Sequence, residues 1–76
     1  SRTDSAPPRA VVDALARAAI DDPAPEVRDA SVEAIARAAA RHRAHEATFT
    51  AVLQRALTDV DPAVRERAVD ALAHWP

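Results

Sequence analysis

Four acidic residues occupy matching places in two similar stretches of the chain, and they are the first candidates for a binding surface. The stretches are PEVRDASVEAIARA from Pro25 and PAVRERAVDALAHW from Pro62, offset by 37 residues. If the acids project from one face, they form an acidic patch suited to a partner segment that carries Arg or Lys. With the two side chains one turn further along, the candidate partner-binding residues are Asp29, Glu33, Arg37, Glu66, Asp70 and His74.

The same charges also fit an ordinary solvated helix face. Arg37 follows Glu33 by four residues, and His74 follows Asp70 by four. Opposite charges at this spacing on a helix can pair and relieve one another, and alternating signs are typical of solvent-exposed faces. The sequence therefore leaves both interpretations of the acidic residues open.

A short basic cluster could bind phosphate groups or an acidic peptide. It is formed by Arg41, His42, Arg43 and His45. Cations near the carboxyl end of a helix also complement the helix dipole, which requires no ligand. Nucleic-acid binders usually show a more extensive basic surface and aromatic side chains that stack on bases, which this cluster lacks. Nucleic-acid binding is therefore the alternative function, and we do not expect a nucleic-acid partner.

Metal binding and catalysis find little support. His42, His45 and Glu46 could begin a metal site, but no third ligand with suitable spacing accompanies the histidines, and zinc sites need three or four convergent ligands. We expect the histidines to lie in solvent. No spacing places a serine or threonine beside a histidine base. The prediction is a protein that is not an enzyme and holds no cofactor or metal.

Composition narrows the class of protein further. The 76 residues include no glycine and no cysteine, which excludes glycine-rich phosphate loops and disulfide frameworks. The formal net charge is −2, and no apolar run approaches the roughly 18 residues of a membrane span. All ten basic residues are arginine, a bias typical of GC-rich bacterial genomes. We therefore expect a bacterial, cytoplasmic protein with no membrane association.

Apolar periodicity predicts four helices and no strand. The expected ranges are 7–20, 25–41, 49–57 and 62–75, separated by proline- and aspartate-rich turns that end helices. Asp61 is placed to cap the fourth helix, with proline at its first position. The expected core positions are Val12, Leu15, Ala16, Ala19, Val27, Ala30, Ser31, Ala34, Ile35, Ala38, Phe49, Val52, Leu53, Ala56, Leu57, Val64, Ala68, Ala71, Leu72 and Trp75.

The turn and second helix of each unit, DDPAPEVRDASVEAIARA and TDVDPAVRERAVDALAHW, resemble HEAT repeats. The resemblance is strongest to the bacterial HEAT-like group that includes phycobilin lyase subunits. It implies a polar ladder between neighbouring repeats, made here by Asp22, Arg28, Asp59 and Arg65. It also implies an α-solenoid that binds other macromolecules along its second helices, or less commonly an accessory subunit of a pigment or enzyme-modification system.

These observations together predict an all-α fold of four antiparallel helices forming two HEAT-like repeats, a short α-solenoid. Residues 1–6 are expected to be a disordered lead-in, 7–42 the first repeat and 43–76 the second. The expected function is a non-catalytic protein–protein interaction module within a larger protein or array. Its partner would be a protein with a basic segment. A unit this small gains from neighbours that cover its apolar ends, so self-association is possible.

Overall fold

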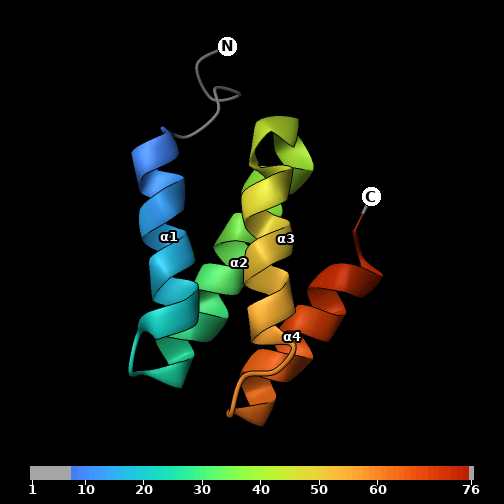
Figure 1. Cartoon of the computed structure of the whole chain (residues 1–76). Helices are drawn as coiled ribbons and strands as arrows, with labels where there is room; N and C mark the ends of the chain where they lie inside the picture. The colour runs from blue at the N-terminus through green and yellow to red at the C-terminus, as the bar shows by residue number, and fades with distance from the viewer. Residues whose placement is uncertain (1–7, 76) are drawn as a thin grey trace.

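The structure, a computed structural model, describes residues 8–75 and shows four α-helices (Figure 1). They are α1 (Arg9–Asp21), α2 (Pro25–Arg41), α3 (Glu46–Ala56) and α4 (Pro62–Ala73), with a short 3-10 helix η2 (Arg43–His45) before α3. Residues 8–75 contain no strand. The predicted all-α class is confirmed. The expected lead-in at residues 1–6 lies outside the described residues.

The helices form two antiparallel hairpins laid side by side. The first hairpin contains α1 and α2, and the second hairpin contains η2, α3 and α4. In Figure 1, α1 and α3 lie next to each other in one layer, and α2 and α4 form the layer behind them. Helix α2 contacts every other helix. Residues on α2 and α4 therefore share one broad face of the molecule.

Proline and aspartate set where the second helix of each hairpin begins. Pro25 opens α2 and Pro62 opens α4, since proline at the first helical position loses no helical hydrogen bond. The Asp61 carboxylate accepts a hydrogen bond of 2.8 Å from the backbone N–H of Ala63, as the sequence predicts. Ala24 holds the equivalent place before α2 and supplies no side-chain cap. The two helix starts therefore share one backbone geometry and differ in one hydrogen bond.

A single apolar core joins the two hairpins. It consists of Ala19, Val32, Ile35, Ala39, Phe49, Val52, Leu53, Ala56, Val64 and Ala68. The ring of Phe49 stacks on that of Trp75, with centroids 4.8 Å apart and an angle of 28° between planes. An aromatic pair of this kind contributes about 1 kcal/mol beyond the area it buries. Phe49 is a core residue as expected, and Trp75 closes the core at the end of α4.

Several predicted core residues are exposed instead. Val27 is 41% exposed, Leu57 36% and Leu72 53%, and Ala30 is exposed as well, whereas Val32, outside the expected face, is buried. On α2 the buried face is centred about one position later than expected, because this helix packs against α1 on one side and the second hairpin on the other. Leu72 is exposed because it faces the open end of the molecule. Whether an apolar face is covered depends on its neighbours, which periodicity does not specify.

None of the helices in the described part of the chain combines the length and apolarity that crossing a bilayer requires.

Candidate functional site

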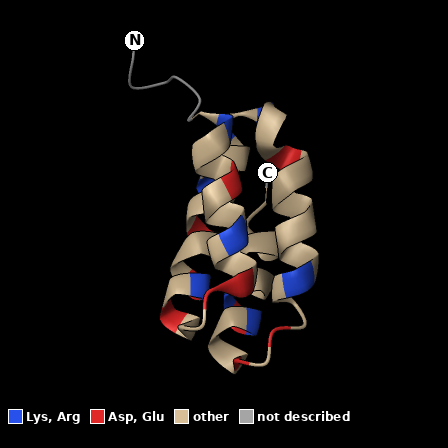
Figure 2. Ribbon diagram, turned by 60° about the vertical axis from the view of Figure 1, so that its left-hand side comes forward, with Lys and Arg blue, Asp and Glu red and all other residues tan. Residues whose placement is uncertain are grey.

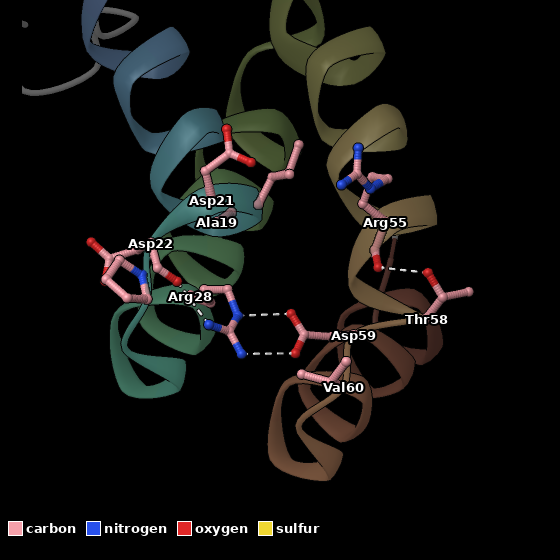
Figure 3. A pocket seen from close by; sticks show the side chains of 10 residues that line it. Ala19, Asp21, Asp22, Arg28, Arg55, Thr58, Asp59 and Val60 are labelled. Carbon is pink, nitrogen blue, oxygen red and sulfur yellow. Dashed lines mark hydrogen bonds and ion pairs between the residues drawn. The ribbon is translucent and has the colours of Figure 1, made fainter.

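The two hairpins are joined by a buried ion pair between Arg28 and Asp59. Arg28 lies in the first turn of α2, and Asp59 lies in the turn between α3 and α4. Arg28 Nε donates to Asp59 Oδ2 at 2.9 Å, and Nη2 donates to Oδ1 at 3.0 Å (Figure 3). The two side chains are 11% and 9% exposed. Two parallel hydrogen bonds to one carboxylate fix the position and orientation of both groups.

The remaining hydrogen-bonding groups of this pair are also used. Arg28 Nη1 donates to the carbonyl oxygen of Asp22 at 2.7 Å, and Asp59 Oδ1 accepts from the backbone N–H of Asp61 at 2.9 Å. The hydrogen bond from Arg28 lowers the pKa of the Asp59 carboxyl group, and the same bond raises the pKa of Arg28. The pair therefore stays ionised at neutral pH and serves as a structural joint.

The other two predicted ladder residues do not form a second such pair. Arg65 Nη1 donates to the carbonyl oxygen of Asp59 at 2.7 Å, repeating the backbone contact of Arg28, but no carboxylate among residues 8–75 lies within ion-pair distance of Arg65. Asp22 Oδ1 accepts from the backbone N–H of Ala24 at 2.9 Å, and no described cation pairs with its carboxylate. The structure thus forms one arginine–aspartate pair of the predicted ladder, between Arg28 and Asp59. Asp22 at one end and Arg65 at the other have no ion-pair partner among the described residues.

A groove of about 460 Å³ runs along the ion pair between the two hairpin turns. Asp21, Arg55 and Val60 line it together with the ion pair (Figure 3). The charges of Arg28 and Asp59 satisfy each other, so they offer little to a ligand entering from this side. We therefore look for the binding surface on the layer formed by α2 and α4.

The six predicted partner-binding residues all lie on α2 and α4 or at their ends, and a seventh residue links the two helices. Arg67, on α4, donates from Nε to Asp29 Oδ1 at 2.7 Å, and its Nη1 lies 3.6 Å from Glu33 Oε2. The hydrogen bond to Asp29 raises the pKa of Arg67. Arg37 also donates to Glu33 Oε2, at 2.9 Å. Asp29 and Glu33, the two predicted acids on α2, are therefore neutralised by arginines.

The acids of α4 remain available. Glu66 is exposed and has no ion-pair partner among the described residues. Asp70 is 60% exposed at its side chain, and its one ion-pair partner among the described residues is His74, whose Nδ1 lies 3.3 Å from Asp70 Oδ1. The surface therefore holds four carboxylates and two arginines, and the two carboxylates that no described arginine contacts within ion-pair distance belong to α4. Acidic and basic residues are interspersed over the helices in Figure 2.

Between these charges lies a small groove with an apolar lining. Ala36 and Ala40 line it from α2, and Ala71 and Trp75 line it from the end of α4. Its volume is about 210 Å³, and its charged lining includes Glu33, Arg37, Arg67, Asp70 and His74. Pockets for drug-sized ligands are larger, about 300–1,000 Å³. The groove has room for one or two aliphatic side chains within a ring of charge.

Arg67 is the residue of this surface that sequence reasoning missed. It occupies the place of Ala30 in the first hairpin, so the repeat pattern gives no reason to pair it with anything. Asp29 and Arg67 are 38 residues apart, about one repeat, and residues at that separation face each other across neighbouring second helices. A search for opposite charges at that offset would have found the pair.

The residues of the basic cluster differ in burial. His45 is 5% exposed, and neither of its ring nitrogens has a hydrogen-bond partner, so the expectation of solvent-exposed histidines is wrong for this residue. It is buried because η2 turns the chain inward ahead of α3. Arg41 and Arg43 are exposed, and the ring of His42 meets that of His45 edge to face at 6.3 Å. Within residues 8–75, no group of three His, Cys, Asp or Glu side chains could hold a metal ion.

A protein-family model described as "HEAT repeat associated with sister chromatid cohesion" matches residues 3–35 and 44–72. The comparisons found no similar protein among the curated proteins and no similar chain among the solved structures. The HEAT-repeat resemblance seen in the sequence is therefore confirmed. Its narrower form, a likeness to the bacterial group of phycobilin lyase subunits, is not supported by this match.

Proposed function

Since the chain belongs to the family of HEAT repeats associated with sister chromatid cohesion, we propose that it is a non-catalytic protein-interaction module that binds its partner on the face formed by α2 and α4. The observation that carries the proposal is the apolar groove between these helices, with the acids of α4, which no described arginine binds in an ion pair, beside it. We further propose that residues 7–42 and 43–76 are its two repeats, the second beginning at η2.

The shape and charge of this face favour an amphipathic partner segment. Apolar side chains of the partner would enter the groove between Ala36 and Ala71 and contact Trp75. Arg or Lys side chains one helical turn away would reach Glu66 and Asp70, which no described arginine binds in an ion pair. Binding of an amphipathic helix in a groove is a common mode of peptide recognition, in which apolar anchors supply affinity and charges supply specificity.

Direct binding to nucleic acid is the weaker alternative. The net charge of −2 and the acids on α4 would repel phosphate groups, and burial of His45 leaves the basic cluster smaller than the sequence indicates. We therefore propose a protein partner. The bacterial, cytoplasmic setting suggested by composition is not supported by the match, because the family description refers to sister chromatid cohesion.

A peptide selection tests the proposal even though the partner is unidentified. The immobilised chain is used to select from a library of random 16-residue peptides, and the enriched peptides should combine spaced apolar residues with Arg or Lys. Replacing Glu66 by Gln and Asp70 by Asn together should weaken the best peptide on the order of fivefold, since exposed ion pairs contribute modestly.

The matched control removes a carboxylate on a different layer. Asp13 lies on α1 and pairs with Arg9, so Asp13→Asn changes the net charge without touching the proposed face and should leave peptide affinity unchanged. The proposal is overturned if the α4 double variant binds the selected peptides as tightly as the unchanged chain. It is equally overturned if the control weakens binding to the same extent.

A further inference from the structure

The outer surface of the second hairpin repeats a surface that is buried in the first. Val32 and Ile35 on α2 are fully buried, whereas their equivalents on α4, Val69 and Leu72, are 56% and 53% exposed. The difference arises because the second hairpin covers α2, and no described residue covers the same side of α4. Apolar side chains that are exposed together in this way indicate an unfilled contact.

The second hairpin also carries an arginine, Arg65, whose equivalent in the first hairpin is in an ion pair while, among the described residues, Arg65 itself is not. Arg28 and Arg65 hold equivalent places, and each donates from Nη1 to a backbone carbonyl at 2.7 Å. Arg28 uses Nε and Nη2 to bind Asp59. Nε and Nη2 of Arg65 have no partner among residues 8–75. The backbone contact therefore holds Arg65 in place. The edge of its guanidinium group that could bind a carboxylate, Nε and Nη2, is not used within the described chain.

The opposite end of the molecule, on the first hairpin, carries groups complementary to Arg65 and to the exposed apolar side chains of α4. Val64 is fully buried against the first hairpin, whereas its equivalent Val27 is 41% exposed. Asp22 is equivalent to Asp59, and each accepts a backbone hydrogen bond of 2.9 Å two residues further on. Asp59 also receives an arginine, but Asp22 receives none among the described residues. This end thus presents an apolar side chain and a carboxylate without a cation.

We propose that a second copy of this chain packs head to tail on the first, with the first hairpin of one copy covering the second hairpin of the next. Arg65 of one copy then pairs with Asp22 of the other, as Arg28 pairs with Asp59 within the chain. Val69 and Leu72 are covered by Val27 and its neighbours. Complementarity in both charge and apolar surface between the two ends of the chain favours a second copy as the occupant of these ends.

Two consequences follow from the geometry of this contact. It joins different surfaces, so each added copy leaves the same two ends open and assembly continues beyond a dimer. It also lacks the second ionic link found within the chain, because Ala30 stands where the internal contact has Arg67. The association is therefore weaker than the packing of the two hairpins and depends on concentration, with a dissociation constant of about 10 µM to 1 mM.

Sedimentation velocity on the whole chain, from about 10 µM to 1 mM, tests the proposal with charge reversals. Arg65→Asp and Asp22→Arg should each weaken association about tenfold, because each places like charges at the contact. An equal mixture of the two variants should associate again, since every contact between unlike chains regains opposite charges. Arg17→Asp, on an exposed part of α1, is the control and should behave as the unchanged chain.

Circular dichroism of each variant establishes that it is folded, and Val69→Glu provides a second test at a side chain that is already exposed and contributes little to the core. Weakened association of this variant supports the contact. A chain that stays monomeric at about 1 mM overturns the proposal, as does assembly that stops at a dimer. Association that survives both charge reversals, or a mixture that fails to restore it when both variants are folded, overturns it as well.

Discussion

Arg28 on α2 and Asp59 in the turn after α3 lie 31 residues apart in the sequence and meet through two hydrogen bonds of 2.9 and 3.0 Å. The small side chains of the core can slide past one another at little cost, whereas a bidentate pair requires one relative position of the hairpins. We infer that this pair fixes the register of the second hairpin on the first, and with it the spacing of α2 and α4. Buried polar pairs are best attested in this role.

Asp59→Asn should destabilise the fold much more than Asp22→Asn. Either asparagine keeps an oxygen for the backbone hydrogen bond two residues on, but only Asp59→Asn removes the charge that faces Arg28. We expect a loss of about 2 kcal/mol in the free energy of unfolding for Asp59→Asn, and a few tenths for Asp22→Asn. Urea unfolding followed by circular dichroism measures both. Equal losses would show that the buried pair has no special part in joining the hairpins.

The same pair predicts how stability changes with pH. The hydrogen bond that Arg28 donates to Asp59 holds the folded-state pKa of Asp59 below the ordinary value of 3.8. A carboxyl group with a lowered pKa contributes stability that is complete above the unfolded-state pKa and is lost as the pH falls through the folded-state pKa. The difference in unfolding free energy between the unchanged chain and Asp59→Asn should therefore be constant near neutrality and shrink below about pH 4. A difference that stays constant down to about pH 2 contradicts this.

His45→Leu should stabilise the protein. The imidazole is buried with no partner for either nitrogen, and a buried polar group without hydrogen bonds carries a desolvation cost that an apolar side chain avoids. We expect a gain of about 1 kcal/mol in the free energy of unfolding. His42→Leu, at a partly exposed ring in the same turn, is the control and should change stability little. A clear loss of stability in the His45 variant would mean that the ring has a stabilising contact.

The two helix starts form a matched pair for testing the cap. Asp61→Ala removes the hydrogen bond to the N–H of Ala63 and should cost about 1 kcal/mol. Ala24→Asp places the same side chain before α2, where φ and ψ differ from those of Asp61 by only a few degrees, and should gain up to about 1 kcal/mol. Thermal unfolding of the two variants measures both changes. No gain from Ala24→Asp would indicate that the two turns are not equivalent.

Features with local causes can be predicted from the sequence. Proline at the first helical position and Asp61 before it act within one turn, so the start of α4 and its cap follow from a few neighbouring residues. The burial of Phe49 follows from the 3.6-residue period of an α-helix. The structure confirms both features: Asp61 caps α4 and Phe49 is buried.

Features that depend on the neighbouring hairpin cannot be predicted in this way. Leu72 and Ile35 are equivalent by periodicity, and only the position of each at the end or middle of the molecule decides that one is exposed and the other buried. Ala30 holds the place of Arg67 in the first hairpin and carries no charge, so the link from Arg67 to Asp29 appears only when α2 and α4 are placed side by side. The burial of His45 likewise depends on the path of η2.

The most direct test of the proposed binding face is a map of where a selected peptide contacts the chain. The ¹⁵N-labelled protein, at a concentration below that of self-association, is titrated with the tightest peptide from the selection while backbone amide shifts are followed. The account predicts that the largest shifts fall on α2 and α4 around Ala36, Ala71 and Trp75, with a change in Trp75 fluorescence. Shifts concentrated on α1 and α3, with those three residues unchanged, would contradict it.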